Sequence, residues 1–559
     1  MFTISAYCSI ICSTMFVRKS KVTQNGKSYT YLQLVHNRRD PSGKVKTDVI
    51  LKLGREDLIS SAFVSDMVEA LAPYADRELT SADTTFQFLR SREIGVVWFL
   101  NELWNRLGMG KAISSLVEDR KFRNPIERMV FAMVAARIVS PGSKLSIEHW
   151  VENKVLVPGL KRVDVHNLYR AMDLLVESDE QVQHAVFTSV AKEAKLELDL
   201  VFLDTTNTYF ECDVDESPSG LLKRGRSKDN HPELPIVSIA FAVTKQGIPI
   251  RCWTFPGNTS DQRIVDQVKS DLGQWNLGKV ILVGDAGFNS IENRKVFLRE
   301  CGDFIVGEKL RTGSEGAAVE ALHRKGRYRT LDNGLQIKNV IMDEGMATER
   351  RFVIVKNPDA EKRDRLVRDS IVDEVKRRLD ALSQMEGKDH TKAACSLRSH
   401  GTFGRYIIQT KGGVLKLDKA KIASEELLDG KFLVSTSNMN LDAADVAMGY
   451  KQLFEIERVF RDMKNVLEIR PVYHRLDDRI RSHILICWMA MVLVRYAEEE
   501  AGATWFSISR TLDDITAGLI ETKSSTLWYT SRISDEAKEL FSKLSLKVPG
   551  KVLEVDSKV

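Results

Sequence analysis

The sequence predicts an α/β protein whose central part is preceded by a small antiparallel sheet and a helical region. Three patterns support this prediction. Alternating runs separated by turn sequences occupy residues 16–53. Apolar residues then recur at helical spacing between residues 95 and 195. From residue 198 onward, short and fully apolar runs alternate with helical patterns, which is typical of a sheet covered by helices.

Length and composition indicate a soluble protein of several domains. The chain has 559 residues, of which 43% are hydrophobic and 28% charged, with a formal net charge of +5. This small excess does not by itself indicate a nucleic-acid partner. The seven cysteines are scattered and odd in number, as is usual in a reducing compartment. The longest apolar stretch, residues 484–494, is about half the roughly 20 residues that a membrane span needs. We therefore expect a cytoplasmic protein.

The N-terminal segments are predicted to be a disordered leader and a basic sheet. Residues 1–14 are apolar, but no basic residue precedes the run and no cleavage site follows it, which argues against a signal peptide. Residues 15–60 are predicted to form a small antiparallel β domain with turns at Asn25-Gly26 and at residues 40–43. Lys and Arg alternate there with Tyr and His, a mixture suited to phosphate contact. A solvated β face explains the same pattern equally well.

Residues 90–197 are predicted to form a helical DNA-binding domain. The helical patterns cover residues 98–107, 113–117, 125–139 and 165–175. Ser140-Pro141-Gly142-Ser143 breaks the chain before a further short helix, as in a helix-turn-helix motif. Plain helical bundles contain the same kind of turn, so this pattern favours DNA binding only in combination with the motifs farther along the chain.

Two aspartates stand directly after apolar strands in residues 198–308, the first part of the predicted α/β core. Leu200–Leu203 ends in Asp204, and Val280–Val283 is followed by Gly284 and Asp285. A carboxylate at the edge of a hydrophobic layer needs a partner or a metal ion. The simpler alternative is that each Asp is a turn or cap residue, which is common after a strand.

The remaining chain is predicted to contain an insertion, the second part of the core and a C-terminal region. Residues 309–430 are the insertion, and they include a strongly charged helix at 361–385. The core resumes at 431–500 with a strand and one long helix from about Asp442 to Leu467. Residues 501–559 are predicted to be a C-terminal helical region that can serve oligomerisation.

The long helix has one stripe suited to DNA chemistry. At about 100° per residue, Glu457 shares this stripe with Tyr450, Arg461 and Lys464. Basic side chains there can hold phosphates, and the tyrosine can stack or donate a hydrogen bond. The face that adjoins the stripe and packs on the sheet contains Leu453, Ile456, Phe460, Met463 and Leu467. Glu455 and Asp462 are predicted to point outward. A solvated face of an amphipathic helix is the alternative explanation of the stripe.

Asp204, Asp285 and Glu457, gathered over one sheet, would suit two Mg²⁺ ions, with Mn²⁺ as a substitute, because hard divalent cations take oxygen ligands. Such a pair of ions activates the attacking hydroxyl and stabilises the leaving oxygen in displacement at phosphorus. The sequence has no Gly-x-Ser-x-Gly motif and no P-loop, and it has no paired cysteine zinc motif.

In their order along the chain, these motifs resemble those of the DDE transposases of bacterial insertion sequences, in the branch marked by Tyr-x2-Arg-x3-Glu-x6-Lys. The matching segments are Phe202–Thr206, Pro256–Asp261, Val283–Phe288 and Tyr450–Lys464, and Gly225–Glu233 resembles a linker of that family. The resemblance implies a ribonuclease H-like catalytic core with a β-rich insertion. It also implies an amino-terminal domain that binds terminal inverted repeats, and assembly on DNA as a dimer or larger synaptic complex.

The resemblance further implies that Asp204, Asp285 and Glu457 are the catalytic, metal-binding triad, and that Tyr450 and Lys464 contact DNA near the cleaved end. One residue departs from the signature, because Leu453 stands where the family has Arg. Arg461 or Arg458 can supply the missing charge.

The function predicted from the sequence is that of an insertion-sequence transposase, which binds terminal inverted repeats and target DNA and catalyses metal-dependent strand cleavage and strand transfer. We expect it in the bacterial cytoplasm, associated with the nucleoid when bound to DNA. Two alternatives are a host nuclease or junction resolvase on the same fold and a catalytically silent DNA-binding regulator. His474 lies just beyond the signature and can line a DNA channel, although a structural role is equally expected.

Overall fold

The computed structural model describes residues 15–557 except for 25–26, 40–44, 61–86, 117–124, 212–219, 229–230, 300–301, 311–315, 344–348 and 522–524. The predicted leader, residues 1–14, lies outside the described residues. Contacts divide the chain into two units, the first made of residues 1–88, 521–526 and 557–559, and the second of residues 89–520 and 527–556. Each unit is described by itself.

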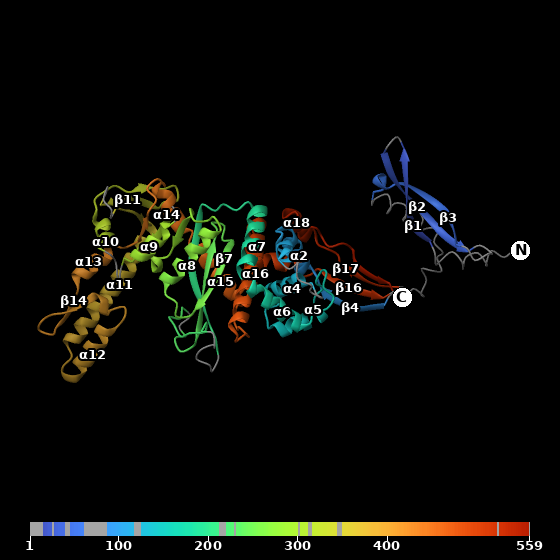
Figure 1. Ribbon diagram of the computed structural model, residues 1–559. Helices are drawn as coiled ribbons and strands as arrows, with labels where there is room; N and C mark the ends of the chain where they lie inside the picture. The colour runs from blue at the N-terminus through green and yellow to red at the C-terminus, as the bar shows by residue number, and fades with distance from the viewer. Residues whose placement is uncertain are drawn as a thin grey trace. The chain divides into compact units, whose positions relative to one another are not determined.

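The smaller unit contains the N-terminal sheet. Its antiparallel strands, in the order β1-β2-β3, are β1 (Met15–Gln24), β2 (Lys27–Arg39) and β3 (Val45–Arg55) (Figure 1). The alternating runs therefore correctly predict a small antiparallel sheet, whereas the predicted turns at residues 25–26 and 40–43 lie outside the described residues.

The helical part of the larger unit comprises α2 (Gly95–Arg106), α3 (Met109–Ser115), α4 (Ile126–Val139), α5 (Lys144–Asn153), α6 (Val165–Glu177) and α7 (Asp179–Ala194). Helix α4 is buried over most of its length and packs against α6 and α16 (Asp477–Ala501). Helices α4 and α5 meet at 90°, as the Ser-Pro-Gly-Ser break predicts. The exposed residues of α5 are Leu145, Ser146, His149 and Asn153, none of them basic. DNA binding by this part stays a prediction.

A nine-stranded sheet crosses the middle of the larger unit. Its strand order is β10-β11-β12-β15-β9-β8-β5-β6-β7. The central strands are β5 (Leu200–Tyr209), β6 (Ile236–Val243), β7 (Pro249–Pro256), β8 (Ile281–Gly284), β9 (Asp303–Gly307) and β15 (Lys431–Thr436). Strand β8 runs parallel to both β5 and β9, whereas β6, β7 and β15 run antiparallel to their neighbours. The sheet is therefore mixed, with β5 and β8 as adjacent parallel strands in its interior.

Helices cover both faces of this sheet. Val201 and Leu203 of β5 pack in one apolar cluster with residues of α8 (Asp261–Gln274) and α9 (Ile291–Phe297). Phe202 lies in the other cluster, together with α14 (Ala443–Lys451), α15 (Phe454–Asn465) and α16. Because successive side chains of a strand point to opposite faces, Asp204 lies on the same face as Phe202. That face carries α15.

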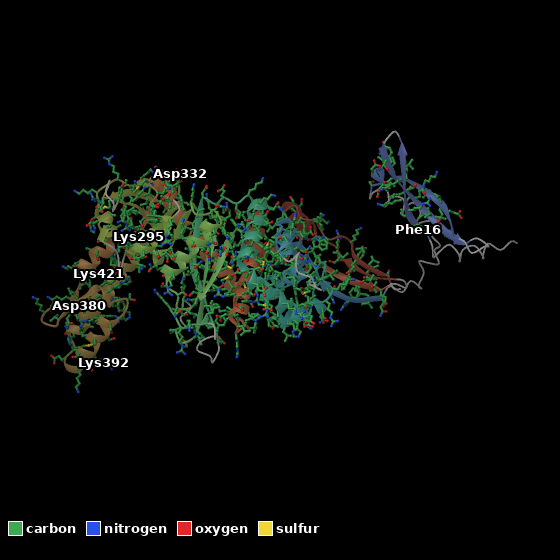
Figure 2. The ribbon with its side chains drawn as sticks, viewed as in Figure 1. Phe16, Lys295, Asp332, Asp380, Lys392 and Lys421 are labelled. Atoms are coloured by element: carbon green, nitrogen blue, oxygen red, sulfur yellow. The ribbon has the colours of Figure 1, made fainter. Side chains whose placement is uncertain are left out.

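The segment predicted as an insertion joins the central sheet. Strands β10 (Arg329–Thr330), β11 (Gln336–Met342) and β12 (Arg350–Lys356) extend its edge, and β12 pairs with β15. The other elements are α10 (Gly316–His323), α11 (Pro358–Ser383), α12 (Gly387–Ser399), η7 (Gly404–Tyr406), β13 (Ile407–Gln409), β14 (Leu415–Leu417) and α13 (Lys419–Glu426). Figure 2 labels charged side chains on three of these helices, Asp380, Lys392 and Lys421. The segment is thus mixed, and the description β-rich fits only its first strands.

The prediction of a helical C-terminal region is wrong. Residues 501–559 contain two helices, α17 (Trp505–Leu512) and α18 (Asp535–Lys543), and three strands, β16 (Thr516–Glu521), β17 (Ser525–Thr530) and β18 (Val552–Ser557). These strands form a four-stranded sheet with β4 (Gln87–Glu93). The β-branched and aromatic residues of β17, Thr526-Leu527-Trp528-Tyr529-Thr530, are the signal that favours a strand there.

Helix α16 is long and apolar enough to cross a membrane by length and composition, and 94% of its apolar window is buried inside the protein. It contacts α4, α6, β7, α15 and α17. This helix therefore behaves as a core helix that joins the helical part to the sheet.

Candidate active site

Asp204 and Asp285 lie side by side on two adjacent strands of the sheet. Leu203 of β5 pairs with Gly284 of β8 in a parallel ladder, and an aspartate follows each of them. The Thr205 N–H donates to Asp204 Oδ1 at 2.7 Å, and the Ala286 N–H donates to Asp285 Oδ1 at 2.6 Å. Asp285 directly follows the end of β8, as predicted, whereas β5 continues past Asp204, which pairs with Phe241 of β6.

Glu457 comes from the first turn of α15. The sequence predicts one helix from 442 to 467. In the structure α14 ends at Lys451, two residues interrupt the helix, and α15 begins at Phe454. The break contains no Gly or Pro, which is why the helical pattern does not reveal it. The buried face of α15 consists of Ile456, Val459, Phe460 and Met463. The ring of Phe460 packs edge-to-face against Phe241 of β6, with 5.6 Å between the ring centroids. This contact packs the helix against the sheet.

The three carboxylates line one hollow of about 260 Å³, together with Tyr450 and Leu453. The pKa of Asp204 is raised to about 6, mainly by burial, with the negative charges of Asp285 and Glu457 acting in the same direction and the charge of Lys228 acting against them. Among the described residues, no three His, Cys, Asp or Glu side chains converge closely enough to hold one metal ion. The acids therefore share a hollow, and their charges favour a cation in it.

Tyr450 stands over this hollow as a protonated phenol. Burial raises its pKa to about 12, and the charges of Asp285 and Glu457 act in the same direction. The hydroxyl fits because residue 307 is a glycine, since a Cβ atom there would lie 2.2 Å from the Tyr450 oxygen. The phenol can therefore donate a hydrogen bond beside the carboxylates.

Sequence reasoning missed Lys228, which lies closest to the first aspartate. Its Nζ is 3.7 Å from Asp204 Oδ1 and 3.1 Å from Thr205 Oγ1, and it also donates to the Thr205 carbonyl oxygen. The available signal was the run Arg224-Gly225-Arg226-Ser227-Lys228, with a basic residue at every second position. Contact with a residue on β5 was not readable from that run.

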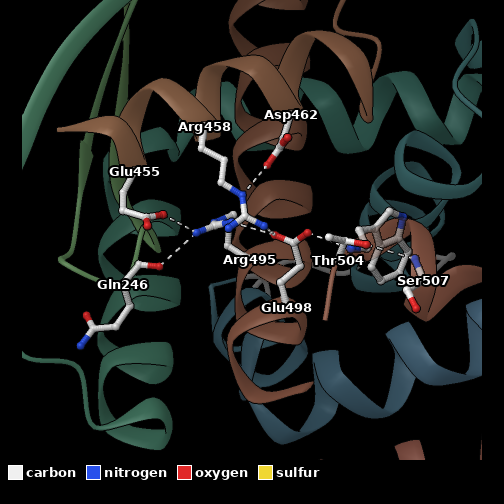
Figure 3. A network of polar contacts seen from close by, with 9 residues as sticks. Gln246, Glu455, Arg458, Asp462, Arg495, Glu498, Thr504 and Ser507 are labelled. Carbon is white, nitrogen blue, oxygen red and sulfur yellow. Dashed lines mark hydrogen bonds and ion pairs between the residues drawn. The ribbon is translucent and has the colours of Figure 1, made fainter. Parts of the chain in front are cut away.

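A second side of α15 is held by a buried network of charges (Figure 3). Arg495 of α16 is 3% exposed and donates to Glu455 at 2.8 Å and to Glu498 at 2.7 Å. Arg458 donates to the same Glu498 oxygen at 3.0 Å and lies 3.7 Å from Asp462. The prediction that Glu455 and Asp462 point outward is wrong, because Glu455 pairs with Arg495 of α16, and Asp462 lies beside Arg458, which itself pairs with Glu498 of α16.

This network also extends beyond the helix pair. Arg495 donates to the carbonyl oxygen of Gln246, in the turn between β6 and β7. A Cβ atom at Gly247 would lie 2.6 Å from the Arg495 guanidinium, so a larger residue there would displace it. Glu498 accepts a hydrogen bond from the Trp505 N–H at 2.8 Å, at the start of α17. The side of α15 that bears Glu455 is thereby tied to three other elements.

The remaining predicted DNA contacts have different surroundings. Arg461 is exposed on the stripe of Glu457, and Lys464 is half-buried on the same helix. Arg458 is committed to Glu498, so a phosphate contact from it would require breaking that ion pair.

His474 lies at a second hollow of about 590 Å³, which Tyr209 and Arg470 also line. Burial lowers its pKa to about 4, and the positive charges of Lys144, Arg479 and Arg137 act in the same direction. A DNA contact from this neutral ring would therefore be an uncharged hydrogen bond.

Comparison with known families assigns the chain. The N-terminal domain of IS1634 family transposases matches residues 17–83, and the transposase DDE domain matches residues 223–493. The chain belongs to the insertion-sequence DDE transposases. DDE transposases cut DNA and transfer its strands, and they generally use divalent metal ions. The family predicted from the ordered motifs is thus confirmed.

Two further comparisons add little. A solved synaptic complex of piggyBac transposase with hairpin DNA is 10% identical to this transposase over 81% of this chain and 80% of that chain, with a TM-score of 0.33. A likeness at this level does not establish a shared fold. No curated protein matches this chain.

Proposed function

We propose that Asp204, Asp285 and Glu457 are the catalytic residues of this transposase and hold two Mg²⁺ ions. The observation that supports this assignment is the shared hollow, which gathers three carboxylates from β5, β8 and α15. Carboxylate oxygens are the ligands that Mg²⁺ prefers. The pKa of Asp204 is raised mainly by burial and also by the charges of Asp285 and Glu457, so a bound cation would favour its ionised form. The donor set therefore fits a divalent ion, and Mn²⁺ would serve as a substitute.

The core is proposed to be ribonuclease H-like. Strands β5, β6 and β7 form an antiparallel meander, and β8 and β9 continue the sheet in parallel on the other side of β5. The proposed division of the chain follows from this core: residues 198–308 and 431–500 build it, residues 309–430 interrupt it, and residues 90–197 are a helical DNA-binding part.

In the proposed reaction the protein positions DNA and the ions supply the chemistry. Bound divalent ions activate the attacking hydroxyl and stabilise the leaving 3′-oxygen. The Thr205 and Ala286 N–H groups hold one oxygen of each aspartate, which leaves the other oxygen of each for a ligand. The Tyr450 hydroxyl donates to the DNA beside the cut, and Arg461 and Lys464 contact phosphates along α15.

The proposed partners are the terminal inverted repeats of the element and a target duplex. The transposase is proposed to assemble on this DNA as a dimer or a larger synaptic complex. The proposed site of action is the nucleoid of a bacterial cytoplasm. The two family matches favour this function over a host nuclease, a junction resolvase or a silent regulator.

The experiment is strand cleavage of a labelled duplex that carries an element end, with Mg²⁺ present. Asp204→Asn, Asp285→Asn and Glu457→Gln should each reduce cleavage to background, whereas binding of the duplex should be retained. Glu292→Gln is the matched control, because it neutralises an exposed acid of α9 away from the hollow. Cleavage at the wild-type rate by any of the three triad variants would exclude that residue from the triad.

A further inference from the structure

The segment between β5 and β6 is fixed to the protein although its residues 224–228 form neither helix nor strand. Leu221 N–H donates to Asp477 of α16 at 3.1 Å, and the Leu221 carbonyl accepts from Gly257 N–H at 3.3 Å. Lys223 and Ile236 exchange two backbone hydrogen bonds of 3.2 and 2.9 Å. These contacts to β6, β7 and α16 hold the start of the segment in one place.

The second half of the segment is held by a buried amide. Asn207 of β5 is 4% exposed and contacts the backbone of the segment with both of its polar atoms. Its Nδ2 donates to the Arg226 carbonyl at 3.0 Å, and its Oδ1 accepts from Lys228 N–H at 3.1 Å. At Gly225, a Cβ atom would lie 2.2 Å from the Gly257 carbonyl oxygen, so only glycine allows this close approach. The backbone of residues 221–228 is therefore fixed by contacts at both of its ends.

This fixed backbone presents three basic side chains outward. Exposure alternates from residue 223 to 228, so Arg224, Arg226 and Lys228 are exposed while the residues between them are half-buried. In an extended chain, alternate residues point the same way and are roughly 7 Å apart. The row ends at Lys228, whose Nζ lies 3.7 Å from Asp204. A line of positive charge thus leads to the edge of the active-site hollow.

We propose that Arg224, Arg226 and Lys228, the basic row, bind successive phosphates of the DNA strand that enters the active site. This inference rests on the proposed function, because it takes Asp204 as the site of cleavage. A merely solvated loop would not need a buried asparagine clamp or a glycine fitted against Gly257. Fixed cations at regular spacing suit a regular polyanion, since the side chains then bind without first ordering the backbone.

The test is the salt dependence of DNA binding by the full-length protein. A fluorescent DNA duplex of arbitrary sequence serves as the probe, because phosphate contacts do not depend on sequence. The test variant is Arg224→Gln/Arg226→Gln. The control is Lys388→Gln/Lys392→Gln, which removes the same charge from exposed positions on α12. The slope of log affinity against log salt concentration should become shallower by about 2 in the test variant, at about 0.9 per lost contact. The control should keep the wild-type slope.

A kinetic measurement ties the basic row to the strand that is cut. Because these contacts exist before and during cleavage, the test variant should show a raised KM for the labelled element end and a nearly unchanged kcat. An unchanged salt slope, or a lowered kcat with unchanged KM, would overturn the assignment of the row while leaving the triad intact. If the wild-type protein showed no salt-dependent binding, the proposed function would fail, and the row with it.

Discussion

The acidic residues on two sides of helix α15 differ in whether the protein itself supplies an arginine partner. On one side, Glu457 faces the hollow with Asp204 and Asp285, and among the described residues none of these makes an ion pair with an arginine. On the other side, Glu455 and Asp462 pair with Arg495 and Arg458 in a buried network. The same helix therefore carries acids whose cations are built into the fold and an acid whose cation must come from outside.

This difference shows how the helix is oriented. At about 100° per residue, the apolar face of α15, the network side and the stripe of Glu457 lie roughly a third of a turn apart. The apolar face fixes the helix on the sheet, and the network fixes its rotation against α16. With two sides fixed, the third must face the hollow. The ion pairs of Glu455 and Asp462 therefore determine the direction in which Glu457 points.

The largest expected effect comes from removing the central arginine of the network. Arg495→Met leaves Glu455 and Glu498 buried without their main partner, so we expect the free energy of unfolding to fall by about 3–5 kcal/mol. Urea unfolding followed by circular dichroism measures the loss. Cleavage should also fall, at temperatures where the variant is still folded, because α15 is no longer held in rotation.

The control for this prediction is Arg368→Met, which breaks another buried pair, that of Arg368 with Asp429 in the insertion. It should lose similar stability but keep cleavage when folded. Cleavage at the wild-type rate by folded Arg495→Met would show that apolar packing alone orients Glu457. The charge network would then have no role in fixing the rotation of α15.

A smaller effect is expected from a buried lysine that forms no ion pair with another described residue. Lys144 is 2% exposed, and burial lowers its pKa from 10.5 to about 7, with the charge of Arg137 acting in the same direction. Between these two pH values the unfolded chain binds the proton and the folded protein does not, so stability falls as the pH is lowered through this window. Lys144→Met should therefore be more stable than the wild type at pH 7, on the order of a few kcal/mol.

This gain should vanish near the upper end of the window, where the lysine is neutral in both states. Urea unfolding at neutral and alkaline pH measures the difference, and Lys111→Met, at an exposed position of α3, is the control. An equal gain at both pH values would mean that packing and not charge explains the effect.

The smallest expected effect is stabilisation by the metal itself. Mg²⁺ added to the DNA-free protein should raise its stability by about 1–3 kcal/mol at concentrations well above the dissociation constant. A thermal melt measures the shift, which should disappear in Glu457→Gln but persist in Glu292→Gln, at an exposed position away from the hollow. A shift of the same size in Glu457→Gln would place the ion elsewhere.

Much of the site could be predicted from the sequence because its signals are local. An apolar run followed by an acid marks Asp204 and Asp285. The sequence predicts Tyr450 and Glu457 on one stripe of a single helix, and both line the hollow although they lie on two helices, α14 and α15. The network could not be predicted, because Arg495 directly follows the apolar stretch of α16 and lies 40 residues from its partner Glu455. The helix break at Gln452 and the contact of Lys228 with Asp204 likewise depend on packing between segments distant in sequence.

Parts of the fold could not be predicted either, because they depend on pairing between strands that are distant in sequence. The sequence predicts a separate insertion where strands β10–β12 lie, because nothing in their own pattern shows that β12 pairs with β15, far along the chain. The C-terminal strands pair with β4, which comes from the opposite end of the sequence. Local patterns predict elements, whereas the partner that each element finds is a property of the whole chain.

The position of Arg495 also matters during synthesis of the protein. During translation, Asp204 and Asp285 are synthesised first and Glu457 follows. Arg495, which contacts α15, is added only when α16 is made. We expect a product that ends after α15 to contain all three acids but to lack the ion pair between Glu455 and Arg495 that fixes the rotation of α15.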